Sequence, residues 1–395
     1  MNLKPLSIYL DHNATTPIHP RVKEKVIESM DIYGNASSLH PFGYIAREEI
    51  EKTRKGVLEY LGHSDGQIIF TSGGSESNNL VVKGLVCKGA AGTKKFAGRK
   101  NPHVITTAVE HPSVLTTASC VDRLGADVTV LPVDKTGMVD PDDISKAIRP
   151  NTVLASIMFA NNEVGTIQPV EEIGQILKKN DIAFHCDAVQ AIGKLPLDVN
   201  ILNIDYLSLS GHKINAPKGI GALYIRSTTS ICPLIHGGHQ EKNLRAGTEN
   251  TLGILALGRA IEIISDPEHR NRTAHILHLR DLLEKLIREE TDGVTLNGHL
   301  HERLPNTINL SFDRVDGAAV LEMLAMHGIG ASTGSACSSG EETPSHVLTA
   351  MGVPPERSRS SVRFSLGFGN TEDTIRKAAE TINSVIKRLR AMSPL

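Results

Sequence analysis

The stretch from Ala183 to Lys213 reads AFHCDAVQAIGKLPLDVNILNIDYLSLSGHK and contains two apolar runs, at 183–185 and 206–209, that predict strands. The polar residues that follow these runs are Asp187, Gln190, Ser210, His212 and Lys213. A lysine after a strand is usually a solvated residue. Here, a carboxylate at one strand end and a lysine at a later one form the pair that holds pyridoxal phosphate. The lysine amine forms a Schiff base with the aldehyde, and the carboxylate keeps the pyridine nitrogen protonated.

The first two-thirds of the chain alternate short apolar runs with helical or loop stretches, which predicts an α/β domain with a mainly parallel seven-stranded sheet. Most of these runs are continuously apolar, as expected of strands covered on both faces. The last strand follows Lys213 after only the turn APKGIG, too short for a crossover helix, so we expect it to be antiparallel. The predicted strands are 68–71, 104–108, 128–131, 153–158, 183–185, 206–209 and 222–225.

After about Thr251 the pattern becomes that of a smaller α+β domain. It predicts helices over 252–264 and 317–326, a further helix with Ile276, Leu279, Leu283 and Leu286 on one face, a strand over 307–312, and a last helix from 370–373 onward. We expect residues 13–255 to form the large domain, and residues 1–12 and 256–395 the small one. The Lys- and Gly-rich segment 88–100 predicts a surface loop without an assigned role.

Composition excludes several classes of partner. The 42 basic and 44 acidic residues give a net charge of −2, so neither nucleic acid nor an anionic membrane is an expected partner. No run of 18 apolar residues occurs, and the first residues lack a signal or transit pattern, so we expect a soluble cytoplasmic protein. The odd, scattered set of five cysteines, without a CxxC pair, indicates reduced thiols: Cys87, Cys120, Cys186, Cys232 and Cys337.

The run TSGGSES at 71–77 follows a predicted strand and precedes a helical run at 78–85. Glycines and hydroxyl groups at a helix N-terminus make an anion site, because free N–H groups and the helix dipole face the anion. Such turns are common and the signal is weak alone, but beside Lys213 it predicts a phosphate cradle that Ser210 and His212 complete.

Four more residues are candidates. His111, just past a strand, is placed to stack on the cofactor and exchange protons, although a lone His is more often structural. Asn162 also follows a strand and could contact cofactor or substrate. Arg363 is either a structural salt-bridge donor or a clamp for an amino-acid carboxylate. Cys337 lies in ASTGSACSSGEET, a run too small and polar for a core, which suits a nucleophile on a mobile loop.

Together these segments closely resemble the cysteine desulfurases of the NifS/IscS type, within the class V aminotransferases. The matching motifs run in order through nearly the whole chain: YLDHNATTP, GNASSLHPFG, FTSGGSESNN, VEHPSVL, ANNEVGTIQPV, HCDAVQAIGK, SLSGHKINAPKGIGALYIR, GGHQEKNLRAGTEN, TGSACSSG and VRFSLG. Two departures are mild: GGS replaces a common Gly-Ala-Thr, and SGHK a frequent SAHK. Both keep a hydroxyl and a small residue.

The resemblance implies a homodimeric, pyridoxal-phosphate-dependent enzyme of fold type I. It implies Lys213 as the Schiff-base lysine, Asp187 on the pyridine nitrogen and His111 stacked on the ring. Further implied cofactor contacts are Gly74, Ser75, Asn162, Gln190 on the ring hydroxyl, Ser210, Gly211, His212, and Thr248 from the other subunit. Arg363, Asn35 and Asn162 would bind substrate. Cys337 would accept the sulfur, in a loop like the long mobile loop of one group of the family.

The expected reaction converts L-cysteine to L-alanine and leaves a persulfide on Cys337, which then supplies iron–sulfur cluster assembly. Lys213 would remove the Cα proton, and the Cys337 thiolate would attack the substrate sulfur. A scaffold protein would receive the sulfur and could share a transient [2Fe–2S] cluster with Cys337. Two alternatives remain: a selenocysteine lyase or other amino-acid lyase of the same fold, and a non-catalytic binding protein.

Overall fold

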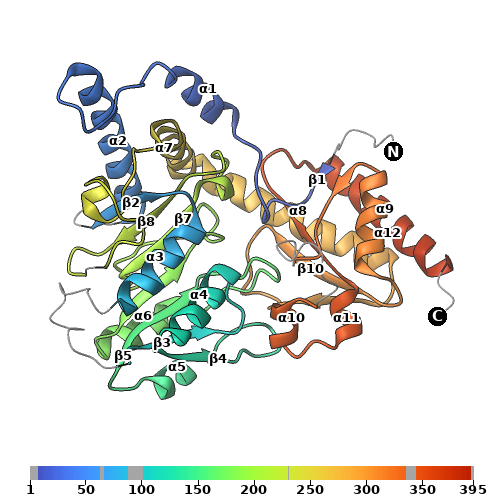
Figure 1. Cartoon of the computed structure of the whole chain (residues 1–395). Helices are drawn as coiled ribbons and strands as arrows, with labels where there is room; N and C mark the ends of the chain where they lie inside the picture. The colour runs from blue at the N-terminus through green and yellow to red at the C-terminus, as the bar shows by residue number, and fades with distance from the viewer. Residues whose placement is uncertain (1–7, 63–65, 88–100, 230, 335–343, 393–395) are drawn as a thin grey trace.

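A computed structural model describes residues 8–62, 66–87, 101–229, 231–334 and 344–392. Its main feature is a seven-stranded sheet in the order β2-β8-β7-β6-β5-β3-β4 (Figure 1). Every neighbouring pair is parallel except the two that involve β8, so the mainly parallel sheet and its antiparallel strand after Lys213 are confirmed. The strands are β2 Gln67–Thr71, β3 His103–Thr107, β4 Asp127–Leu131, β5 Thr152–Met158, β6 Ala183–Asp187, β7 Tyr206–Ser210 and β8 Gly221–Ile225.

Both faces of this sheet are covered, because alternate residues of one strand point to opposite sides. Ile68 and Phe70 of β2 belong to one apolar cluster, which includes α2 (Pro41–Tyr60), α6 (Val170–Lys179) and α7 (Thr251–Ser265). Ile69, between them, belongs to a second cluster, with Leu80 and Val81 of α3 (Gly74–Val86) and residue Val121 of α4 (Pro112–Arg123). Continuous burial explains why these strands carry unbroken apolar runs.

A third apolar cluster unites the first described residues with the C-terminal part. β1 (Ile8–Tyr9) pairs in parallel with β11 (Ile329–Gly330). A three-stranded antiparallel sheet, in the order β12-β10-β9, lies beside helices α8, α9 and α12 (Figure 1). These elements are α8 Glu268–Glu290, β9 Val294–Asn297, β10 Thr307–Phe312, α9 Gly317–Met326, β12 Ser361–Ser365 and α12 Glu372–Met392.

The predicted β10 and α9 have the same bounds in the structure, and the division at 12/13 and 255/256 stays a prediction. The segment 88–100 lies outside the described residues. No helix in the described ranges is long and apolar enough to cross a bilayer.

The remaining elements are α1 Pro20–Glu28, α5 Pro141–Ala147, α10 His346–Ala350 and α11 Pro355–Arg359, with single 3-10 turns at η1 Gly211–Lys213 and η2 Glu241–Asn243.

A buried ion pair fastens α2 to the edge of the large sheet. The Arg54 guanidinium donates from Nη1 and Nη2 to the two carboxylate oxygens of Glu241, at 2.8 and 2.9 Å. Glu241 also accepts from the main-chain N–H of Phe70 on β2, at 2.9 Å. Because both side chains are nearly excluded from solvent, loss of Glu241 leaves the buried Arg54 charge with the more exposed Glu51 carboxylate, at 3.1 Å, as its remaining ion pair among the described residues.

We therefore expect Glu241→Gln to lower the free energy of unfolding by about 3 kcal/mol. Lys55→Met is the matched control, because its pair with Glu59 is exposed and contributes less than about 0.5 kcal/mol. Urea denaturation followed by far-UV circular dichroism measures both. Equal stability of the two variants would contradict a structural role for the buried pair.

Candidate active site

Lys213 ends the turn η1 directly after β7 and reaches across to the segment that follows β1. Its Nζ donates to the main-chain oxygens of Asn13 and Ala14, the latter at 2.9 Å. Asn13 is buried and joins the two parts of the molecule, because its Nδ2 donates to Oγ1 of Thr307 on β10 at 2.9 Å. Sequence reasoning missed Asn13. Its available signal was the polar run DHNATT immediately after an apolar stretch.

Asp187 is the last residue of β6, at the carboxyl end of the parallel strands, where ligands of open α/β sheets bind. Its Oδ2 accepts from Nδ2 of Asn78 on α3 at 2.7 Å, and its Oδ1 accepts from the main-chain N–H of Val189 at 3.0 Å. These bonds fix the orientation of a carboxylate that is 6% exposed. Asn78 is a second site residue that sequence reasoning did not single out.

Residues of the predicted phosphate cradle lie close to one another, and their binding of a phosphate stays a prediction. Helix α3 begins at Gly74, earlier than expected, and no side chain caps its N-terminus. A Cβ on Gly74 would lie 2.6 Å from Cγ2 of Val189, and a Cβ on Gly73 would lie 3.6 Å from Oγ of Ser210. The start of α3 at Gly73 and Gly74 therefore lies beside Ser210, at the end of β7.

His212 is a further residue of the predicted phosphate cradle, and its ring carries no positive charge at pH 7. Its Nδ1 lies 3.2 Å from Oγ1 of Thr15, and its main-chain oxygen accepts from the Thr16 N–H at 3.0 Å. Desolvation, followed by the positive charges of Lys213 and Lys218, lowers the pKa of His212 to about 4. It is neutral at pH 7, so the helix N-terminus and Lys213 provide the positive potential.

His111 is the N-cap of α4, and this local role positions its ring. Nδ1 accepts from the main-chain N–H of Ser113 at 3.1 Å and from its hydroxyl at 2.7 Å. Because an N–H can only donate, the neutral ring carries its proton on Nε2. Burial, and then the charges of Lys213 and His346, lower the pKa of His111, whereas Asp187 acts in the opposite sense.

Arg363 on β12 is almost completely buried and is held by the protein itself. Nη2 donates to Oδ1 of Asp11 at 2.7 Å, and Nη1 donates to the main-chain oxygen of Asn162 at 2.9 Å. Nδ2 of Asn13 donates to the same Asn162 oxygen, at 3.1 Å. The structure thus brings Arg363 and Asn162 to the Asn13 junction. Binding of a substrate carboxylate by Arg363 stays a prediction.

Two predicted residues do not join this site within one chain. Asn35 and Thr248 line a separate groove of about 320 Å³ together with Met30, Tyr33 and Leu252. Among the described residues, no hydrogen bond links Asn35 or Thr248 to Lys213, Asp187 or Ser210. Cys337 lies outside the described residues. No cluster of three or more metal-ligating side chains occurs in the part of the chain that the structure describes.

The residues present fit pyridoxal phosphate. The uncapped α3 N-terminus and Ser210 suit the phosphate, the fixed Asp187 carboxylate suits a protonated pyridine nitrogen, and Lys213 supplies the amine. In addition, Oδ1 of Asn78 is buried without a partner among the described residues, although its amide nitrogen is bonded to Asp187. A polar ligand at this position would satisfy it.

Comparison with known proteins agrees with this arrangement. The model of the family Aminotransferase class-V matches residues 8–377. "Cysteine desulfurase IscS" of Methanosarcina thermophila is 48% identical, covering 98% of this chain and 94% of its own length. A solved "NIFS-LIKE PROTEIN" superimposes with a TM-score of 0.87 at 38% identity, over 97% of this chain and 100% of its own. The structure named "SspA in complex with cysteine" has a TM-score of 0.79 at 38% identity, over 91% and 99%.

The fold and the lysine–aspartate site define a pyridoxal-phosphate-dependent enzyme of the class V aminotransferase architecture. The chain belongs to this family, and the resemblance to its NifS/IscS-type cysteine desulfurases is confirmed.

Glu110, beside His111, is a fully buried carboxyl group behind the site. Oε1 accepts from the Thr107 hydroxyl at 2.7 Å and from the Met158 N–H at 2.9 Å, while Oε2 has no partner among the described residues. Burial, with a smaller contribution from the charge of Asp187, raises the pKa of Glu110 to about 8. Glu110 is therefore mostly protonated at pH 7, so it places little negative charge near Asp187.

This shift gives a pH-dependent stability. An acid whose folded pKa is raised stabilises the fold fully below its unfolded pKa of about 4.5, and this contribution is lost as pH rises through about 8. Glu110→Gln cannot ionise, so we expect wild type to lose stability relative to it between pH 5 and 8, by up to about 1.4 kcal/mol per pH unit. Exposed Glu322→Gln is the control. Parallel stability curves for wild type and Glu110→Gln, measured by urea denaturation, would refute a neutral Glu110.

Proposed function

We propose that this chain is a cysteine desulfurase that releases L-alanine from L-cysteine and receives the sulfur on Cys337. The observation that supports this function most directly is that Lys213, Asp187 and the α3 N-terminus lie together at the carboxyl ends of β6 and β7. The chain is also 48% identical to a cysteine desulfurase. Pyridoxal phosphate, when bound, supplies the electron sink for the charge left at Cα.

The residues of the chain have separate roles in this proposal. Lys213 would hold the cofactor aldehyde and would take the Cα proton of cysteine on Nζ. Asp187 would keep the pyridine nitrogen protonated. His111 is the proposed proton carrier, delivering from Nε2 because Nδ1 is engaged by Ser113. Gln190, Gly211 and the phosphate-cradle residues Gly74, Ser75, Ser210 and His212 would hold the cofactor.

The sulfur step uses the Cys337 thiolate. Its Sγ attacks the substrate Sγ, so an S–S bond forms while the substrate C–S bond breaks and its electron pair goes to the carbon skeleton. Two protons then complete L-alanine, and Cys337 remains as a persulfide. No external oxidant is needed, because sulfur moves from one organic thiol to another at the same total oxidation state. Arg363 and Asn162 are proposed to hold the cysteine carboxylate.

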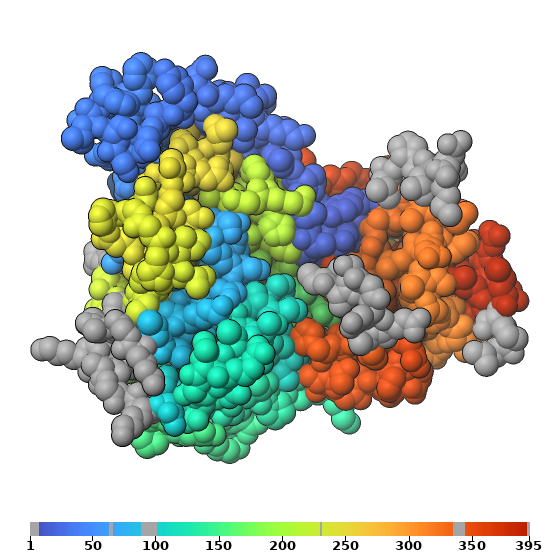
Figure 2. All heavy atoms as spheres, in the orientation of Figure 1, coloured from blue at the N-terminus to red at the C-terminus, as the bar shows by residue number. Residues whose placement is uncertain are grey.

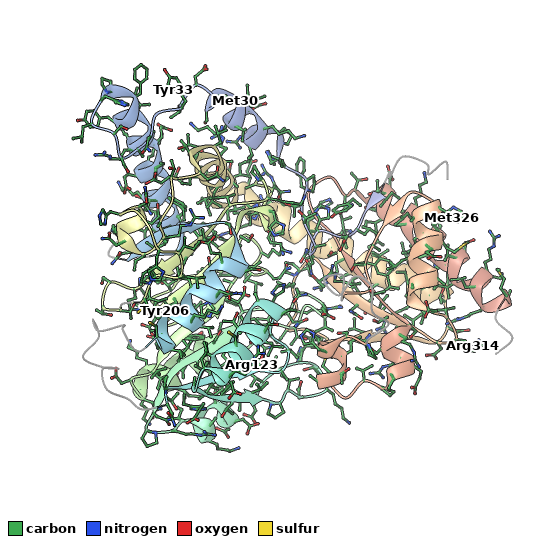
Figure 3. All side chains as sticks on the ribbon, viewed as in Figure 1. Met30, Tyr33, Arg123, Tyr206, Arg314 and Met326 are labelled. Carbon is green, nitrogen blue, oxygen red and sulfur yellow. The ribbon has the colours of Figure 1, made fainter. Side chains whose placement is uncertain are left out.

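A second copy of the chain would complete the site. Large apolar side chains project from the corner formed by α1 and the start of α2, where Tyr33 is 74% and Leu39 82% exposed. This corner stands out from the body of the molecule, and Met30 and Tyr33 lie on it (Figures 2 and 3). A homodimer that covers this patch could bring Thr248 to the partner's phosphate cradle and Asn35 to its substrate.

The persulfide is proposed to pass to an iron–sulfur scaffold protein in the cytoplasm, where reduced thiols persist. A transient [2Fe–2S] cluster shared with Cys337 would belong to the same hand-over. Both proposals rest on the chemistry of a thiol nucleophile in a small, polar segment and on the name of the similar protein.

The activity is tested by incubating the protein with L-cysteine and pyridoxal phosphate and measuring alanine and protein-bound sulfur. We expect Lys213→Ala to abolish alanine formation. Cys337→Ala should lower it by about 100-fold or more, since loss of a nucleophile raises the barrier by several kcal/mol. Cys87→Ala, which removes an exposed thiol of the described residues, is the matched control.

Mass spectrometry of the Cys337 peptide should show an added sulfur only in proteins that retain this cysteine. Full turnover of cysteine by Cys337→Ala would overturn the sulfur-acceptor role. Turnover of selenocysteine alone would instead favour the lyase alternative.

A further inference from the structure

Lys194 lies one helical turn after Gln190 and folds back onto it. Its Nζ donates to the main-chain oxygen of Gln190 at 3.0 Å and to the side-chain Oε1 at 2.9 Å. In its charged form the Lys194 amine has donors and no acceptor, so in that form it bonds only the oxygen of the Gln190 amide. Lys194 therefore decides which way this buried amide points.

The other end of the amide faces the candidate active site. Nε2 of Gln190 donates to the main-chain oxygen of Asn13 at 2.9 Å, the same oxygen that accepts from Nζ of Lys213. If the amide turned over, Oε1 would face the Asn13 carbonyl, and two acceptors would meet without a proton between them. Lys194, Gln190, Asn13 and Lys213 thus form one chain of hydrogen bonds in which each orientation depends on the previous one.

Among the described residues Lys194 has no acidic partner, so an ion pair does not explain its position. No ion pair includes it among the described residues. Desolvation, followed by the charges of Lys213 and Arg363, lowers the pKa of Lys194 to about 7, and Lys194 in turn disfavours a charge on His12. Lys194 thus lies among cations, and both of its hydrogen bonds within the described residues go to Gln190, which indicates that its role is to hold this glutamine.

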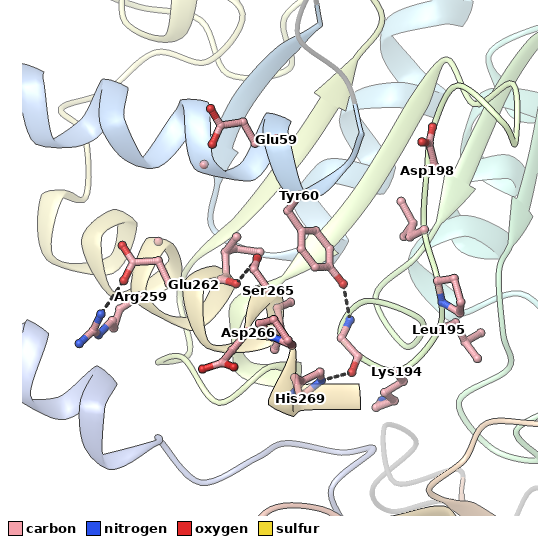
Figure 4. A pocket seen from close by; sticks show the side chains of 18 of the residues that line it. Glu59, Tyr60, Lys194, Leu195, Asp198, Arg259, Glu262, Ser265, Asp266 and His269 are labelled. Atoms are coloured by element: carbon pink, nitrogen blue, oxygen red, sulfur yellow. Dashed lines mark hydrogen bonds and ion pairs between the residues drawn. The ribbon is translucent and has the colours of Figure 1, made fainter. Parts of the chain in front are cut away.

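The backbone before Lys194 is held from two sides. The Gly193 N–H donates to Oη of Tyr60 on α2 at 3.1 Å, and Nε2 of His269 on α8 donates to the Gly193 oxygen at 2.5 Å. Figure 4 shows these two bonds at the edge of a groove that Lys194 also lines, together with Asp266. These two bonds therefore fix the backbone from which the Lys194 side chain extends.

We propose that Lys194 is a positioning residue that locks the Gln190 amide with its N–H groups toward Asn13 and Lys213. The second N–H of Nε2 is then offered to an oxygen of the ligand bound at Lys213. The proposal rests on the proposed function only in taking that ligand to be pyridoxal phosphate, whose ring oxygen would accept the bond.

The first test uses the cofactor-free protein. The chain has only five glutamines, so ¹⁵N-glutamine labelling gives five side-chain amide signals, and Gln190→Leu identifies the one from Gln190. We expect this signal to exchange with solvent about tenfold faster in Lys194→Met, because one anchor of the amide is lost. Lys194→Arg, which keeps the donor, should restore slow exchange. Lys218→Met, an exposed lysine of the next turn, should have no effect.

The second test measures the dissociation constant of pyridoxal phosphate by absorbance titration. Lys194→Met and Gln190→Leu should each weaken binding about tenfold, and the double variant should be no weaker than Gln190→Leu alone. Lys194→Gln replaces Lys194→Met if the latter does not fold. Unchanged amide exchange in Lys194→Met, or additive losses in the double variant, would overturn the proposal. Failure of the wild type to bind pyridoxal phosphate would count against the proposed function, while the amide exchange still decides the role of Lys194.

Discussion

The main-chain carbonyl of Asn13 is the point on which the arrangement of this molecule depends. It accepts from Lys213 after β7 and from Gln190 after β6, and the Asn13 side chain bonds Thr307 on β10 and the Asn162 oxygen. One residue from the N-terminal segment therefore fixes the ends of two sheet strands against the C-terminal part. A shift of this segment would misplace Lys213 and Gln190, and it would also disturb the Asn162 oxygen that Asn13 and Arg363 share.

The electrostatics around this point favour an anionic ligand. Lys213 and Arg363 bring positive charge, Lys194 with its pKa lowered to about 7 is partly charged at pH 7, and the α3 N-terminus adds its dipole. Burial keeps two nearby groups largely neutral: the pKa of Glu110 is raised to about 8, so it adds little negative charge, and that of His212 is lowered to about 4, so it adds no positive charge. Asp187 and Asp11 are acidic side chains near this point, and each accepts a hydrogen bond from an assigned donor. A phosphate and an amino-acid carboxylate match this balance of charge.

Much of the fold follows from local pattern, because strands buried on both faces carry unbroken apolar runs, as in 153–158, and the six-residue turn after Lys213 forces an antiparallel strand. Helices α1 and α2 were missed because their N-caps are His19 and His40, followed by proline, instead of the usual Ser, Thr, Asp or Asn. Asn13 and Asn78 escaped notice because their roles depend on contacts over 100 residues away. No local spacing encodes such contacts.

Lys213, held at the Asn13 carbonyl, is the amine that we propose to bind the cofactor. Reduction of the protein with borohydride in the presence of pyridoxal phosphate, followed by peptide mass mapping, tests this role directly, because reduction makes the lysine link permanent. We expect one added phosphopyridoxyl group, on Lys213. A group found on the neighbouring Lys194, or no site-specific addition at all, would contradict it.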